Sequence, residues 1–321
     1  MLIPAGAVHS PKALPTLNYD HIGVYMRALE RLHDPRARAI LRQIAQGPAD
    51  LAREKRAARR EGIPLERRLL QQPVPPLNEN AAPLYHEFVV LERSHPLHLP
   101  EYANGMSTRY AYTPEQLDTV RRILHDRPDV MGLVHRIGDR RRCVFQHDWN
   151  KDSSIFGPDI FVIRSVERLL RTESYLLSRQ GRYDEAIADE VRAFRVAEHA
   201  ASDRLLISYM VGVACESIAV VGMRDIVTLA GPNAPGVDAR AAHAIRWEHS
   251  KFSLRSSLRG ETTFDVSGLE LLRQQGPRGL AEQINMGIKP FSGERLKDLT
   301  PAEREFFDHL LDAEEARVIH G

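Results

Sequence analysis

The sequence predicts an all-α protein built from stacked antiparallel helices. Helix start and stop signals recur along its 321 residues, whereas the alternating patterns typical of strands are sparse. The segments TPEQ at 113–116 and TPAE at 300–303 each place Thr and Pro before a helix, with Gln or Glu three residues after the Thr. That arrangement satisfies free amide groups at a helix start. We expect an extended segment only at residues 142–146.

Composition and charge define the broad class. The chain is 43% hydrophobic and 27% charged, which predicts a globular body with a sizeable core. Its 44 basic and 43 acidic residues give a net charge of +1, so a nucleic-acid partner is not expected. The arginine-rich stretch at 51–70 also contains acidic residues and no aromatic residue, and it predicts a solvated helix face. A charged partner would have to be recognised by a local patch.

The N-terminus predicts an extended arm over residues 1–19, because Pro4, Pro11 and Pro15 occur there without helical periodicity. It shows no basic segment followed by an apolar run, so a cytoplasmic location is expected. The most apolar window, residues 205–223, contains Glu216 and two serines. We expect a buried core helix there rather than a membrane span, and membrane association only through a partner.

The chain divides into four consecutive segments in this reading. The arm is followed by N-terminal helices and a proline-rich linker at 20–76, where QPVPP at 72–76 acts as a stiff spacer rather than a peptide ligand. A helical core follows at 77–287, and it begins with the helix ENAAPLYHEFVVLE. A C-terminal linker and helix occupy 288–321.

Residues 158–200 predict a helical hairpin with two distinct faces. One face of its first helix is apolar and contains Ile163, Val166, Leu169, Leu170, Leu176 and Leu177. The other carries Arg164, Arg168, Arg171, Tyr175 and Arg179, spaced by four, three, four and four residues. We interpret this second face, the arginine stripe, as a surface that binds a protein partner with an acidic or extended segment. The alternative is a solvated face that pairs internally, for example Glu167 with Arg171.

The turn of the hairpin, QGRYDEAI, resembles the interhelical turn of a tetratricopeptide (TPR) unit. Gly181, Tyr183, Ala186 and Ile187 occupy matching places, whereas Leu170 and Glu190 stand where that family favours aromatic residues. The resemblance implies that the arginine stripe lies on the face that TPR proteins use to hold peptides, often acidic or carboxylate-ended ones. No 34-residue period continues downstream, so a solenoid of repeats is not predicted.

A broader resemblance covers residues 60–275. GIPLERRLL, PVPPLNENAAPLY, CVF, the QGRYDEAI hairpin, LLISYMVGVACESIA and SLRGET occur in this order. The order resembles an uncharacterised bacterial all-helical family of large, high-GC genomes. Members have no assigned reaction, and many begin with a membrane anchor or export signal that this N-terminus lacks. The resemblance therefore implies a helical fold and no mechanism.

An enzyme is the alternative to a binding protein. Glu216 and Glu261, with His243 and His249, could form a buried carboxylate and histidine cluster suited to hydrolysis, although we expect Glu216 to be a core glutamate paired with an arginine. The sequence contains no HExxH, GxSxG, P-loop or paired CxxC motif. We therefore predict no catalytic residue and no cofactor, and a noncatalytic scaffold or accessory subunit as the function.

The remaining polar clusters predict no metal site. His95 and His98 are separated by a proline and a leucine, and no cysteine or carboxylate pair lies nearby. His147 could be oriented by Asp148, although a loop with an aromatic anchor is the simpler interpretation. The only cysteines, Cys143 and Cys215, are either buried free thiols or joined by one bridge; their sequence positions do not decide between these alternatives. We therefore predict no metal ligand and no cofactor-binding residue.

Overall fold

The computed structural model describes residues 35–147, 157–248, 252–275 and 299–320. In this part of the chain every regular element is a helix, and the β structure is limited to one isolated parallel bridge between Asn80 and Arg142. The predicted all-α class is confirmed. The expected arm at 1–19 and the candidates Asp148 and His249 lie outside the described residues.

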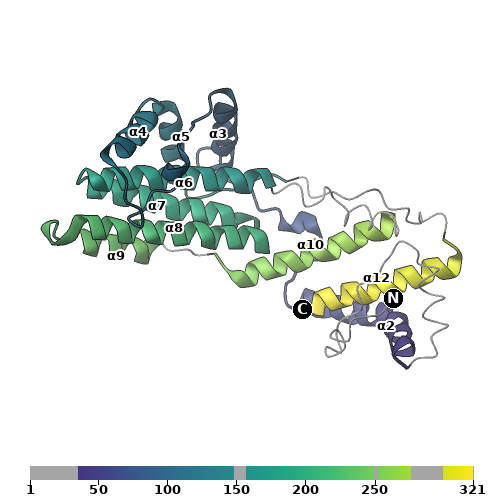
Figure 1. Ribbon diagram of the computed structural model, residues 1–321. Helices are drawn as coiled ribbons and strands as arrows, with labels where there is room; N and C mark the ends of the chain where they lie inside the picture. Colours follow the sequence, from purple (N-terminus) through teal and green to yellow (C-terminus); the bar gives the residue numbers. More distant parts are fainter. Residues whose placement is uncertain (1–34, 148–156, 249–251, 276–298, 321) are drawn as a thin grey trace. The chain divides into compact units, whose positions relative to one another are not determined.

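The helices follow one another along the chain, with short connections between α4 and α5 and from α6 to α9 (Figure 1). The α-helices are α2 (Pro35–Arg60), α3 (Ala82–Ser94), α4 (Pro114–His125), α5 (Pro128–Asp139), α6 (Gly157–Arg179), α7 (Tyr183–Ala200), α8 (Leu206–Ala230), α9 (Val237–Glu248), α10 (Leu254–Gln275) and α12 (Pro301–His320). Short 3-10 helices lie at Arg67–Leu70, Glu101–Ala103, Ala201–Asp203 and Gly231–Asn233.

Both helix starts expected from the TPxx segments are confirmed. At α4 the Thr113 hydroxyl accepts a hydrogen bond from the Gln116 amide at 3.2 Å, and the Gln116 side chain accepts one from the Thr113 amide at 2.9 Å. At α12 the same pair of bonds joins Thr300 and Glu303, at 3.3 and 2.9 Å. Each reciprocal pair satisfies two amide donors that would otherwise lack a partner.

The chain forms two compact units that do not follow the consecutive segments expected from the sequence. One unit combines residues 1–69 with 260–321, and the other consists of residues 70–259. In the first unit α2 packs along α12, although the two helices lie near opposite ends of the chain. The close approach uses Gly47, where a Cβ atom would lie 2.7 Å from the Ala313 backbone nitrogen. Helix α10 contributes residues to both units.

The second unit is centred on α6, α7 and α8, which pack against one another. Helices α3 and α5 lie against α6 and α7, and α9 lies against α7 and α8. The shared core includes Tyr85, Ile137, Ile163, Leu170 and Phe194. The buried charged residues Glu167, Arg171, Asp189, Glu190 and Asp225 lie on α6, α7 and α8, so the packing that buries the core also fixes their positions.

The predicted hairpin is present as α6 and α7. Gly181 ends α6 with a positive φ of 76°, a conformation that glycine adopts readily. The amides of Gly181 and Arg182 bond back to the carbonyls of Ser178 and Leu177 at 3.1 and 3.0 Å, which satisfies the last carbonyls of the helix. These bonds explain the glycine in QGRYDEAI. The likeness to a TPR unit stays a prediction.

Helix α8 is the one helix of the described residues long and apolar enough to cross a membrane, and 33% of its most apolar 18-residue window is buried. A core helix of a bundle can meet the same description. The expectation of a buried core helix holds for one face, which includes Ser208, Cys215, Ala219 and Met223. It is wrong for the opposite face, where large apolar side chains are exposed.

Candidate functional site

The arginine stripe expected on α6 is not a continuous surface. Arg171 is only 1% exposed and Tyr175 is also buried, while Arg164 and Arg179 are exposed and Arg168 is half-buried. Helix α6 contacts α3, α4, α5, α7 and α8, so little of its circumference remains free. The prediction that these five residues share one accessible face is therefore wrong for Arg171 and Tyr175.

Arg171 instead forms the centre of a buried ion-pair network. Its guanidinium bonds to Glu190 of α7 at 3.2 Å and to Asp225 of α8. Asp225 also accepts hydrogen bonds from the Ser107 and Thr108 hydroxyls, at 2.8 and 2.6 Å. Burial alone would raise the pKa of Asp225, but the bonds from Thr108 and Ser107 outweigh it and lower that pKa. Arg171 therefore ties three helices together.

Two carboxyl groups near Arg171, those of Glu190 and Glu167, each have an oxygen atom that accepts no hydrogen bond. Burial raises the pKa of Glu190 to about 7, although Arg171 opposes this shift. Glu167, the partner expected for Arg171, is buried on α6 with an Oε1 atom that accepts no hydrogen bond. Burial, followed by the charge of Glu190, raises the pKa of Glu167 well above its ordinary value. The internal pairing of Arg171 is confirmed, but its partners are Glu190 and Asp225.

A second cluster brings together His135 of α5, Glu173 of α6 and Asp189 of α7. His135 Nε2 lies 2.6 Å from Glu173 Oε2 and 3.7 Å from Asp189 Oδ1. The hydrogen bond to Glu173 raises the pKa of His135, and burial raises the pKa of Asp189 to about 7. Arg192 donates to Asp189 Oδ1 at 2.7 Å. One nitrogen and two carboxylates from three helices thus meet at one point.

Glycine at position 138 allows α5 and α7 to approach closely beside this cluster. A Cβ atom on Gly138 would overlap the Cβ of Arg192. Where α5 and α7 meet, the Arg192 guanidinium donates hydrogen bonds to Asp139 Oδ1, at 2.9 Å, and to Asp189 Oδ1. Because Gly138 follows His135 by about one helical turn, the close contact brings the imidazole within reach of α7.

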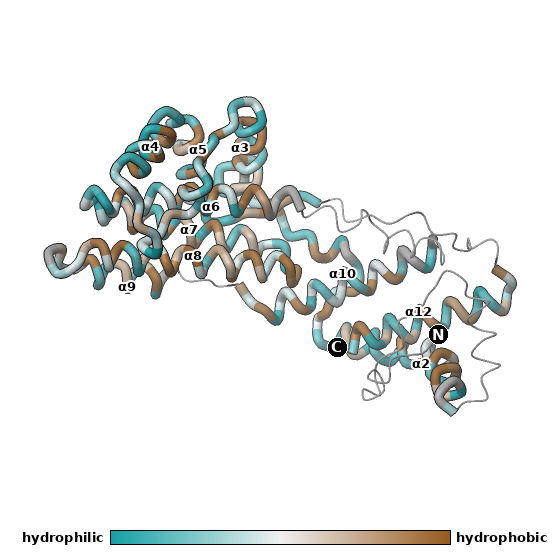
Figure 2. Tube along the Cα trace, in the orientation of Figure 1, coloured by the Kyte–Doolittle hydropathy of each residue, from teal (hydrophilic) through white to brown (hydrophobic). Residues whose placement is uncertain are grey.

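The exposed side of α8 carries several large apolar side chains. Ile207, Met210, Val213 and Val220 are 38–58% exposed, and their spacings of three, three and seven place them on one helical face. We call this set the α8 face. Figure 2 shows hydrophobic colour recurring along the length of α8. A surface of this kind is typical of a binding site rather than of scattered exposed side chains.

The hydrolytic cluster expected around Glu216 is not supported by the described residues. Glu216 is half-buried rather than a core glutamate, and His243 is exposed. Among the described residues of the second unit, the buried carboxylates are Glu167, Asp189, Glu190 and Asp225.

The structure also places the remaining sequence candidates. His95 and His98 are both exposed. His147 Nε2 lies 3.0 Å from Asp203 Oδ1, which is distant in sequence. Cys143 and Cys215 are buried thiols that are not bridged to each other.

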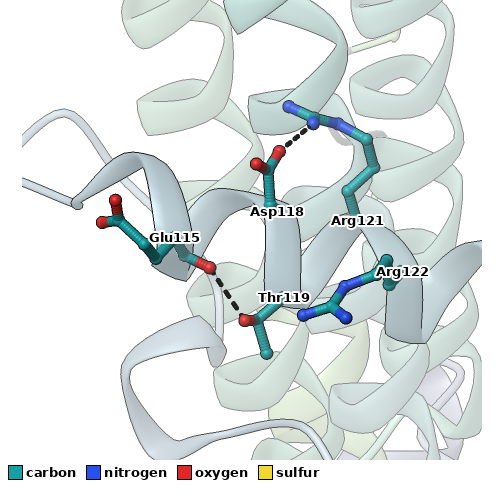
Figure 3. A pocket seen from close by; sticks show the side chains of 5 residues that line it. All are labelled: Glu115, Asp118, Thr119, Arg121 and Arg122. Carbon is teal, nitrogen blue, oxygen red and sulfur yellow. Dashed lines mark hydrogen bonds and ion pairs between the residues drawn. The ribbon is translucent and has the colours of Figure 1, made fainter.

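A hollow of about 370 Å³ lies on α4 (Figure 3). Its lining residues all come from this one helix: Glu115, Asp118, Thr119, Arg121 and Arg122. Asp118 pairs with Arg121, and the Thr119 hydroxyl bonds to the Glu115 carbonyl at 2.8 Å. Because binding sites normally gather polar groups from several elements, this hollow offers little specificity.

Searches of family models, curated proteins and solved structures found no match for this chain. The fold and the geometry above therefore define its class: an all-α helical protein with a buried ion-pair network and one exposed apolar helix face. The TPR-like and bacterial-family resemblances depend on the sequence segments alone.

Proposed function

We propose that this protein is a noncatalytic scaffold or accessory subunit, and that it binds another protein through the α8 face. The observation that carries the proposal is the set of four large apolar side chains, 38–58% exposed, on one side of one helix. Burying apolar surface contributes about 25 cal/mol per Å². Covering the α8 face with a partner would therefore supply a substantial favourable term for association.

The shape of the α8 face favours a helical partner segment. From Ile207 to Val220 the face extends for about 20 Å, or roughly four helical turns. Ala214 and Ser217, which are also exposed, contribute small side chains between the larger ones. An amphipathic helix could pack its own apolar ridge against such a surface.

The charges around the α8 face favour a partner helix with acidic flanks. Arg204 is exposed just before α8 begins, and the Arg224 side chain is 53% exposed near its other end, where it pairs with Asp225. Arg164 and Arg168 of α6 instead lie near Cys215, on the buried side of α8 and away from the α8 face. Arg204 and Arg224 would attract acidic groups at the two ends of the interface.

Site-specific photo-crosslinking in native cells tests the proposal. A photoreactive phenylalanine analogue replaces Met210, and the control places it at Val90 of α3, which is exposed but lies on another helix. We expect a discrete crosslinked protein from position 210 and none from position 90. Adding Val213→Asn and Val220→Asn should abolish the crosslink while leaving the circular dichroism spectrum unchanged.

The crosslinked peptide identifies the occupant of the face. We expect a helical segment with acidic residues at its ends, whose synthetic peptide binds wild-type protein more weakly as salt rises. Replacing Arg204 and Arg224 with Gln should reduce that affinity about tenfold and flatten the salt dependence. A crosslink to residues of the same chain or to a second copy would overturn the proposal, as would a crosslink that persists in the double Asn variant.

A further inference from the structure

We propose that His135, Glu173 and Asp189 form a binding site for a divalent transition metal of the zinc type. Their ligand atoms all lie within 4.8 Å of one another. They project from α5, α6 and α7, three helices that pack against one another. Metal sites in helical bundles are commonly built this way, from side chains on facing helices.

The distances suit coordination after a small movement. Ligand atoms around a tetrahedral zinc lie about 3.3 Å apart, given metal-ligand bonds of about 2.0–2.1 Å. His135 Nε2 and Asp189 Oδ1 are 3.7 Å apart, close to this value. His135 Nε2 and Glu173 Oε2 are 2.6 Å apart, the length of a direct hydrogen bond. A metal would replace the shared proton, and the long, partly exposed Glu173 side chain could move back by about 0.7 Å.

Asp189 provides an independent indication of a missing ligand. Its side chain is 2% exposed, and its Oδ2 atom accepts no hydrogen bond. A buried carboxylate oxygen without a partner costs free energy, and a metal ion would remove that cost. Arg192 satisfies only Oδ1, and its half-buried side chain also binds Asp139. The site therefore retains acceptor capacity after its internal ion pair is counted.

The ligand set indicates the class of metal. Calcium and magnesium prefer oxygen ligands alone, whereas an imidazole nitrogen with two carboxylates suits zinc and its first-row neighbours. His135 and Glu173 are partly exposed, so water can reach a fourth coordination position. Three protein ligands and one open position are typical of a zinc ion that binds an exchangeable molecule.

Titration of the chelator-treated full-length protein with Co²⁺ tests this site directly. Co²⁺ bound by nitrogen and oxygen ligands absorbs visible light much more strongly when its coordination number falls below six. We expect saturable absorbance from one strong site, and competition by Zn²⁺. His135→Asn and Glu173→Gln replace partly exposed residues and should each weaken binding at least about tenfold.

Two matched variants distinguish this site from other surface groups. His125→Asn removes a largely exposed histidine of α4, and Glu185→Gln removes an exposed glutamate of α7; both should retain wild-type Co²⁺ affinity. Circular dichroism confirms that each variant is folded. Absence of the visible bands in wild-type protein, or equal affinity in His135→Asn, would overturn the inference and leave a hydrogen-bonded cluster that carries only protons.

Discussion

The two units both bury a carboxylate against basic side chains, but they position the cations differently. In the second unit Arg171 is as deeply buried as its partners Glu190 and Asp225. In the first unit Glu315 is fully buried, whereas its cations Lys55 and Arg273 are 27% and 22% exposed, at 2.7 and 3.5 Å. The central cation of one network is internal, although Arg224 also reaches Asp225 from the surface, whereas both cations of the other network reach solvent.

This difference determines how strongly each unit is destabilised when the cation of its network is removed. An internal guanidinium needs a partner for each charged neighbour, because water cannot replace a lost bond. Ser107 and Thr108 supply additional donors to Asp225 for this reason. A lysine at the edge keeps its ammonium group hydrated while its apolar stem covers the core. We therefore expect the second unit to be far more sensitive to loss of its cation.

Replacing Arg171 with Met should produce the largest loss of stability. It leaves Glu190 buried without its counter-charge and Asp225 with Arg224 alone, and breaking a buried pair costs about 3–5 kcal/mol. Urea unfolding followed by tryptophan fluorescence measures the effect, because Trp149 and Trp247 both belong to residues 70–259. Arg179→Met, an exposed position on the same helix, should change stability by less than about 0.5 kcal/mol. A loss below about 1 kcal/mol for Arg171→Met would contradict the internal-network account.

Glycine-to-alanine changes test close helix packing in both units. A Cβ on Gly222 would overlap the Glu190 carboxyl group, and a Cβ on Gly47 would approach the His309 carbonyl and the Ala313 nitrogen. We expect each change to destabilise its own unit by about 1–3 kcal/mol. Tryptophan fluorescence reports the first, and hydrogen exchange of α2 and α12 peptides reports the second.

Gly132→Ala provides the matched control for both substitutions. Gly132 is an exposed helical position of α5 with no atom within 4 Å of the added methyl group. Alanine there should stabilise the helix by about 0.5–1 kcal/mol. Equal effects at positions 132 and 222 would show that the contact with Glu190 has no energetic consequence.

Much of the fold could be predicted because its signals are local. The caps at Thr113 and Thr300 and the glycine at 181 act within a few residues of the chain, so their patterns are visible in the sequence. The pairing of α2 with α12 could not be predicted in this way. It depends on Gly47 meeting Ala313, a contact between distant segments that no short pattern records.

The polar sites were less predictable for a related reason. A stripe at helical spacing identifies one face of α6 but not what covers it, and α7 and α8 cover Arg171. Glu190 did carry a signal, since it stands where the TPR pattern favours an aromatic residue. His135, Glu173 and Asp189 gave no signal, because their convergence requires the packing of three helices.

Replacing Lys55 with Met should destabilise the first unit only modestly. Glu315 keeps Arg273 nearby, and protonation of the Glu315 carboxyl is eased because burial already raises its pKa. We expect a loss of about 1–2 kcal/mol, less than that of Arg171→Met. Hydrogen exchange of α12 measures it, with the exposed neighbour Arg56→Met as the control. A loss as large as that of Arg171→Met would remove the distinction between the two networks.

Replacing Glu167 with Gln should have the smallest effect and the opposite sign. Because the folded state raises the pKa of Glu167, its contribution to stability is fully present below the ordinary glutamate pKa and is lost as pH rises through the folded value. Arg164, Arg168, Arg171 and Glu190 face this carboxyl group and are unchanged in the variant. Gln cannot ionise, so the variant should gain about 1 kcal/mol over wild type at neutral pH and little or nothing at pH 4. Tryptophan-detected urea unfolding across this range measures the difference, and the exposed Glu101→Gln should show no comparable trend. If Glu167→Gln destabilised the protein at neutral pH, the result would contradict this account. It would mean that the ionised Glu167 carboxylate stabilises the folded state through its charge interaction with Arg171.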